Sequence, residues 1–150
     1  MEGYLLVQEF TINFGNAKEL VMPPDGNYEL EIASYEVRPP KKDESKDKGF
    51  NVFLQFKIID PDNVLELNDN FRVYHVIWFD VRNPWGAKPF YEAVCGMELN
   101  GDEVNPMDPQ QFLGEHVQAI LEQQPYEKLG PDGEVLETRT KMVATAFFPV

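Results

Sequence analysis

The chain has 150 residues, of which 43% are hydrophobic, 13% aromatic and 26% charged, and its formal net charge is -13. This length fits one domain with a core of its own, and the composition excludes an intrinsically disordered chain. The negative charge excludes a protein that coats duplex DNA by bulk attraction, so any contact with nucleic acid has to be local.

Cysteine content and hydropathy indicate the compartment. The chain contains one cysteine, Cys95, which excludes a disulfide within it and favours a reducing compartment such as the cytoplasm. The opening MEGYLLVQEF has no basic segment ahead of a long apolar run, and no stretch of about 18 apolar residues follows. We therefore expect neither export nor a membrane span.

The first 22 residues predict an N-terminal arm ahead of a single domain over residues 23–150. In this arm Phe10, Ile12 and Phe14 alternate with polar residues and precede Gly15-Asn16, a pattern typical of a short strand and turn.

Five segments of the domain have strand patterns. In the first, NYELEIASYEV from Asn27, the apolar Tyr28, Leu30 and Ile32 alternate with Glu29 and Glu31, as in a half-buried strand. The other four segments are GFNVFLQFKIID, FRVYHVIWFDV, HVQAILEQQPY and TKMVATAFFPV.

A helix interrupts this series after the third strand. Pro89, Phe90, Val94 and Met97 recur at helical intervals and predict a helix of about ten residues. DPQQFLG then predicts one more helical turn, with Asp108 as its N-cap and a proline in the first helical position.

The order of three strands, a helix and two strands predicts a mainly β protein. It is the order of the OB-fold, a five-stranded Greek-key barrel with a helix between strands 3 and 4, here with an N-terminal extension. An SH3-like barrel also has five strands, but the position of the helix favours the OB-fold. OB-folds bind oligonucleotides or oligosaccharides on the face of strands 2 and 3 and on the loops after strands 1 and 4.

Alternation along strands 2 and 3 predicts that this face combines aromatic rings with cations. Phe53, Tyr74 and Trp78 are the expected outward rings, and Lys57 and Arg72 are the expected cations beside them. Sequence-tolerant binding of single-stranded nucleic acid uses this mixture, because bases stack on the rings while a positive groove follows the backbone.

Further cations flank the face. The loop after strand 1 carries Lys41, Lys42, Lys46 and Lys48, and Lys128, Arg139 and Lys141 come from the loop after strand 4 and the start of strand 5. We expect the four lysines of the first loop, together with Lys57, Arg72, Arg139 and Lys141, to contact phosphates.

Other interpretations stay open. Asp43, Glu44 and Asp47 interleave with the lysines, so the loop could be merely solvated. The ring of Trp78 could pack under the N-terminal arm or the helix, or the aromatic face could join copies in a homo-oligomer.

No pattern indicates catalysis, a cofactor or a metal site. His75 and His116 are 41 positions apart with no Cys or His cluster near either, and the acidic DPDN and LNDN fit turns better than a Ca²⁺ loop. Cys95 lies on the predicted apolar helix and is expected to pack there. A metal-dependent nuclease is the least favoured function, and we expect a non-catalytic protein.

The order of five segments along the chain is similar to that of a known family. The segments are PPDGNYELEIASYEVRPP, GFNVFLQFKIID, KPFYEAVCGM, LGEHVQAILEQQPY and VATAFFP. This order resembles small phage-encoded proteins related to the OB-fold single-stranded-DNA-binding family. The resemblance implies binding of single-stranded DNA in phage replication or recombination, in the host cytoplasm, with phage or host replication proteins as partners. The alternative is a protein-interaction or structural OB module that binds no nucleic acid.

Overall fold

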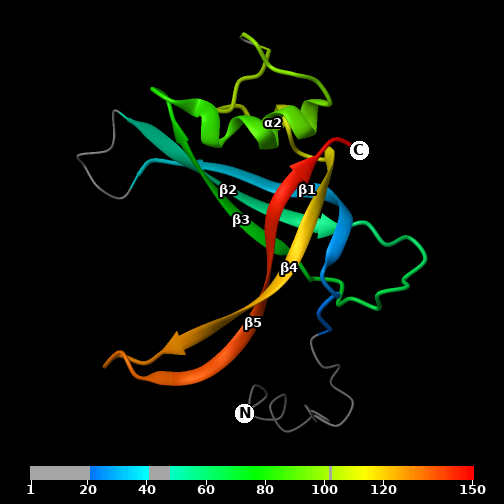
Figure 1. The fold of residues 1–150 in the computed structure, drawn as a ribbon, viewed down its shortest axis with the longest axis vertical. Helices are drawn as coiled ribbons and strands as arrows, with labels where there is room; N and C mark the ends of the chain where they lie inside the picture. Colours follow the sequence, from blue (N-terminus) through cyan, green and yellow to red (C-terminus); the bar gives the residue numbers. More distant parts are fainter. Residues whose placement is uncertain (1–20, 41–47, 102) are drawn as a thin grey trace, which may run out of the picture.

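The computed structural model describes residues 21–40, 48–101 and 103–150. Five antiparallel strands form one sheet in the order β3-β2-β1-β4-β5 (Figure 1). The strands are β1 (Gly26–Arg38), β2 (Gly49–Ile58), β3 (Val73–Asp80), β4 (His116–Leu129) and β5 (Val135–Phe148). Between β3 and β4 lie the helix α2 (Lys88–Cys95) and the short 3₁₀ turns η3 (Pro84–Gly86) and η4 (Pro109–Gln111). The predicted mainly β, OB-like fold is confirmed, including the position of its helix.

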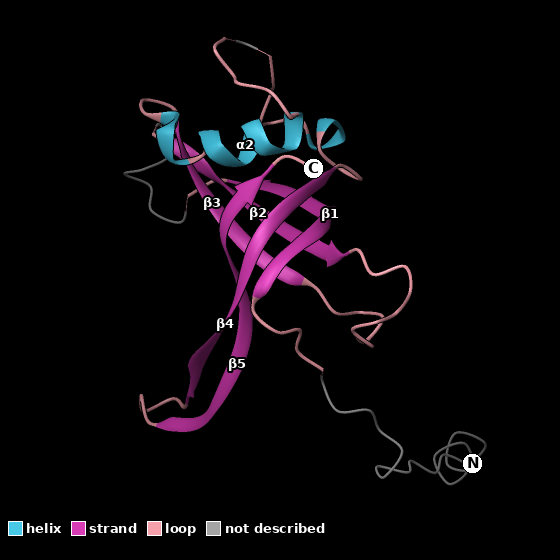
Figure 2. Ribbon diagram, turned by 45° about the vertical axis from the view of Figure 1, so that its right-hand side comes forward, coloured by secondary structure: helices cyan, strands magenta, loops and turns pink. Residues whose placement is uncertain are grey.

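The sheet curls but does not close into the predicted complete barrel. Its two outer strands, β3 and β5, approach each other, and the rings of His75 and Phe147 meet edge to face at 5.1 Å between centroids. Within the described chain, no backbone hydrogen bonds pair β3 with β5. This seam is therefore held by side chains alone, and Figure 2 shows the curled sheet with α2 across one end.

A β-bulge changes the face of β1 halfway along the strand. Leu30 and Ile32 point into the core, and the register with β2 then shifts between Ile32 and Ser34. The extra residue lets Tyr35 return to the interior, where strict alternation would have placed a serine. Everything after the bulge, including Arg38, thus lies on the opposite face from the one that the first half of the strand predicts.

The core lies inside the curl and under α2. Phe56 is fully buried and contacts Phe90 of α2 and Phe147 of β5, with ring centroids 6.1 and 5.8 Å away. The helix carries a proline in its first turn and ends at Gly96, whose φ of 67° suits a glycine. The predicted helix is confirmed, although it stops before Met97.

Buried tyrosines connect the core to the loop after α2. The Tyr35 hydroxyl donates to the Pro106 carbonyl oxygen at 2.6 Å, and the hydroxyls of Tyr35 and Tyr91 lie 2.6 Å apart. Burial raises the pKa of Tyr91 to about 12, so both hydroxyls keep their protons at neutral pH. The predicted turn at η4 is confirmed as well, because the Asp108 side chain accepts a hydrogen bond from the Gln110 amide.

Strands β2 and β3 approach closely at Gly49. A Cβ atom at this position would come within 2.0 Å of the Phe79 carbonyl oxygen, so only glycine allows the pairing to continue to the end of the ladder. Lys48 and the end of β3 are joined by a further hydrogen bond, from the Val81 amide to the Lys48 carbonyl.

The hairpin of β4 and β5 extends well beyond the body of the sheet. Residues 116–121 of β4 pair with β1, and from Gln118 onward they also pair with β5, whereas residues 122–129 pair with β5 alone. The outer part, residues 122–141, is named here the ribbon, and it projects away from the body as a curved two-stranded arm (Figures 1 and 2). The prediction that Lys128 lies in a loop is wrong, because the strand continues to Leu129.

The N-terminal arm expected over residues 1–22 lies almost wholly outside the described residues, including the strand expected at Phe10 to Phe14. Of its last two residues, Met22 packs against the core. Among the helices that the structure describes, none is long and apolar enough to cross a membrane.

Candidate nucleic-acid interface

The outer face of β3 presents large apolar side chains to solvent. Val73 and Ile77 point into the core, whereas the alternate residues Tyr74 and Trp78 point outward and are 65% and 40% exposed. Val76 lies between these two rings and is also exposed. The outward placement of Tyr74 and Trp78 is confirmed, and neither ring packs under α2, since α2 lies across the end of the sheet.

Phe53 lies on the same face of β2, but a cation covers it. The guanidinium carbon of Arg38 lies 4.1 Å from the centre of the Phe53 ring, and Arg38 also forms an ion pair of 2.7 Å with Glu36. Phe53 is therefore not an open platform, and a base could stack there only on Arg38 or after displacing it. The bulge in β1 brings Arg38 to this face, which is why alternation alone did not find it.

A groove of about 600 Å³ runs between β3 and the ribbon. It is lined by Arg72, which directly precedes β3, by Tyr74 of β3 and by Lys141 of β5. The sequence predicts these three residues to belong to one site. The groove is also lined by residues outside the predicted binding site. These are Met22, Asn70, Phe71, His75, Val76, Tyr126, Thr140, Met142 and Val143.

Tyr126 is the ring that the sequence analysis missed. It lies on the ribbon, partly exposed, and the ammonium of Lys141 lies 5.6 Å from the centre of its ring. Tyr126 and Tyr74 thus line one groove from two different strands, and Arg72 and Lys141 belong to the same lining. Its signal in the sequence was weak because Pro125 precedes it, and proline is unusual inside a strand.

Arg72 is held at the end of the groove by the backbone. It precedes β3, whereas the sequence analysis placed it within the strand. Its Nη1 donates hydrogen bonds to the carbonyl oxygens of Asp69 and Phe71, at 3.1 and 2.8 Å. These two bonds fix the guanidinium and leave its other N–H groups for an anion.

The remaining ribbon cations are engaged with a carboxylate. Arg139 and Lys128 both lie beside Glu137, Lys128 at 3.9 Å, and the hydrogen bond that Arg139 donates to Glu137 raises the pKa of Arg139. Both cations are partly neutralised on the ribbon, so of the predicted ribbon cations Lys141 is the one that lines the groove.

The other predicted cations are dispersed. Lys57 is exposed at the end of β2 and shares a smaller cavity of about 310 Å³ with Arg72, Asp60 and Asp69. Lys48 lies at the opposite end of β2, beside Val81. Lys41, Lys42 and Lys46 lie outside the described residues.

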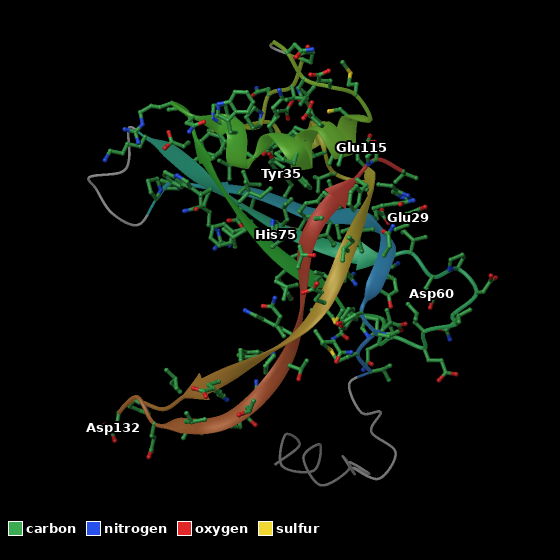
Figure 3. All side chains as sticks on the ribbon, in the orientation of Figure 1. Glu29, Tyr35, Asp60, His75, Glu115 and Asp132 are labelled. Carbon is green, nitrogen blue, oxygen red and sulfur yellow. The ribbon has the colours of Figure 1, made fainter. Side chains whose placement is uncertain are left out.

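The two histidines each contact one residue of a neighbouring strand. His75 lies in the seam against Phe147 (Figure 3), and burial lowers its pKa. His116 pairs with Glu29 through a contact of 2.9 Å. In the part of the chain that the structure describes, no three His, Cys, Asp or Glu side chains come together as metal ligands would.

No protein-family model matches this chain, and no curated protein matches it.

Proposed function

We propose that the protein binds single-stranded DNA without catalysis, in the groove between β3 and the ribbon. The observation that carries the proposal is that two rings and two cations, Tyr74, Tyr126, Arg72 and Lys141, from segments far apart in sequence, line one groove. Aromatic platforms beside cations are what sequence-tolerant binding of single strands requires.

The fold supports the same proposal. The groove adjoins the outer face of β3 and the β4–β5 hairpin, the regions with which OB-folds bind oligonucleotides. A role in phage DNA replication or recombination, in the host cytoplasm, follows only from the resemblance in segment order and belongs to this proposal.

The net charge of -13 limits the mode of binding. Because the protein as a whole repels a polyanion, affinity has to come from stacking and from the few cations at the groove. The affinity will consequently depend on salt through those few contacts, with a slope of about 0.7 per phosphate neutralised on a single strand.

Tryptophan fluorescence during titration with oligothymidine tests the proposal. The chain has two tryptophans, so a Trp85→Phe variant leaves Trp78, on the same outer face of β3 as Tyr74, as the sole reporter. We expect quenching that saturates and that needs more oligonucleotide as salt is raised. A titration without change at low salt, checked by anisotropy of a labelled oligonucleotide, would overturn the proposal and favour the alternative of a protein-interaction module.

A further inference from the structure

A second pocket, of about 550 Å³, lies at the end of the molecule covered by α2. It is formed by η3, the start of α2 and the following loop, and its lining is mostly apolar. The lining residues are Phe79, Pro84, Trp85, Lys88, Tyr91, Leu99, Asn100, Gly101, Val104 and Pro106. Trp85 is 70% exposed there, the highest exposure of any aromatic ring in the described chain.

One cation marks this Trp85 pocket. Of the described residues that line it, Lys88 is the only charged one, and its ammonium lies 5.1 Å from the centre of the Trp85 ring. Among the described residues Lys88 forms no ion pair. The nearby Glu103 uses its carboxylate to accept hydrogen bonds from the Asn100 and Gly101 amides. An occupant of this pocket should therefore be apolar with a negative charge at its rim.

The tip of the ribbon has the matching character. Leu129, Val135 and Leu136 are each more than half exposed there, and the Leu136 side chain lies over Gly130. Asp132, at the turn (Figure 3), and Glu134 add two exposed carboxylates that form no ion pair within the described chain. An isolated two-stranded ribbon is marginally stable in water, so an apolar tip of this kind gains from being covered.

We propose that the ribbon tip of one copy docks in the Trp85 pocket of a second copy. Val135 and Leu136 enter between Trp85 and the loop after α2, and Asp132 and Glu134 lie against Lys88. The volume of the pocket is in the range that accommodates bulky apolar groups. A second copy is favoured as the occupant because both halves of the contact, complementary in polarity and charge, are present on this one chain.

The position of the two surfaces fixes the kind of assembly. The pocket elements and the ribbon turn lie at opposite ends of the long axis of the molecule (Figure 1). A contact between opposite ends is head to tail, so each docked copy offers a free tip and a free pocket to the next. The expected product is an open row of copies, which goes beyond the proposed binding of DNA and does not depend on it.

Sedimentation velocity without DNA, at about 0.15 M salt where the repulsion between acidic copies is screened, tests the inference. Lys88→Glu spoils the pocket and leaves the tip intact, whereas Val135→Ser with Leu136→Ser spoils the tip and leaves the pocket intact. We expect the wild type to sediment faster as its concentration rises and each variant alone to stay monomeric. An equal mixture of the two variants should form a one-to-one complex that grows no further.

Three results would overturn the inference: a wild type that stays monomeric, a variant that associates alone as the wild type does, or a mixture that stays monomeric. All three substitutions are at partly or fully exposed positions, and circular dichroism checks that each variant is folded. Titration of the Lys88→Glu variant with an oligonucleotide short enough for one copy separates the two proposals. Unchanged binding there leaves the proposed function standing whether or not copies associate.

Discussion

The two halves of β4 belong to one strand but have different surroundings. Residues 116–121 pair with β1, those from 118 on pair also with β5, and Val117, Ala119 and Leu121 are fully buried. Residues 122–129 pair with β5 alone and are exposed on both faces. The first half packs in the core, so its side chains have to be apolar and of a size that fits there. The second half packs against no core, so its Tyr126 and the acidic and apolar side chains at its tip are available for contacts with other molecules.

Substitutions in the two regions should differ most in stability. Phe56→Ala removes a fully buried ring that contacts Phe90 and Phe147, and we expect a loss of about 3–5 kcal/mol in the free energy of unfolding. Leu136→Ala, on the ribbon, should stay within about 0.5 kcal/mol of the wild type. Urea unfolding followed by circular dichroism measures both. Equal losses would show that the ribbon unfolds together with the core and would remove the contrast.

Substitution of an exposed groove residue should instead weaken DNA binding and leave the stability of the fold nearly unchanged. Tyr74→Ala is expected to weaken oligothymidine binding by about 1–3 kcal/mol, or about 5–150-fold, because one stacking platform is lost. Its urea midpoint should hardly change, since the ring is exposed. Val76→Ala is the matched control on the same face, because valine offers no ring to a base. Similar affinities for the two variants would remove Tyr74 from the site.

A smaller effect separates the cations of the ribbon from one another. Lys141→Gln should reduce the slope of log affinity against log salt by about 0.7, the share of one phosphate contact on a single strand. Lys128→Gln should leave the slope unchanged, because its ammonium already lies 3.9 Å from Glu137. Titrations at four salt concentrations give the slopes. Equal slopes for both variants would contradict the assignment of Lys141 to the groove.

The smallest expected effect is on how the stability of the fold depends on pH, through His75 of β3. Burial lowers the pKa of His75, so the unfolded chain binds a proton more readily than the folded one below the ordinary pKa of about 6.5. This histidine therefore lowers stability as the pH falls through that value. We expect His75→Asn to flatten the dependence of the urea midpoint between about pH 7.5 and about pH 5. A slope identical to that of the wild type would show that the ring is not buried when neutral.

The sequence predicts the body well because strands have a period of two. Alternation through FRVYHVIWFDV is enough to place Tyr74 and Trp78 outside and Val73 and Ile77 inside. The same rule fails at β1, where one extra residue inverts the face and brings Arg38 over Phe53. A bulge of this kind depends on the pairing with β2, which no local pattern reveals.

The ribbon was predicted least well. Pro125 and the charged residues around it have low strand propensity, so the sequence indicates that the strand ends near Tyr126. Pairing with β5 continues nonetheless to Leu129. The groove was hidden for the same reason, because its second wall is the ribbon, and its shape depends on contacts between segments far apart in the chain.

The seam between β3 and β5 gives the groove an adjustable width. Since ring contacts such as that of His75 with Phe147 hold the seam, the two edges can separate without breaking a hydrogen-bonded ladder. The sheet is thus an incompletely closed barrel, and the width of the gap between β3 and β5 is set by the size of the side chains that meet across it. Because Phe147 also packs against Phe56 and Phe90, a smaller residue there would loosen the seam and the core together, so the width of the groove and the stability of the protein depend on the same ring.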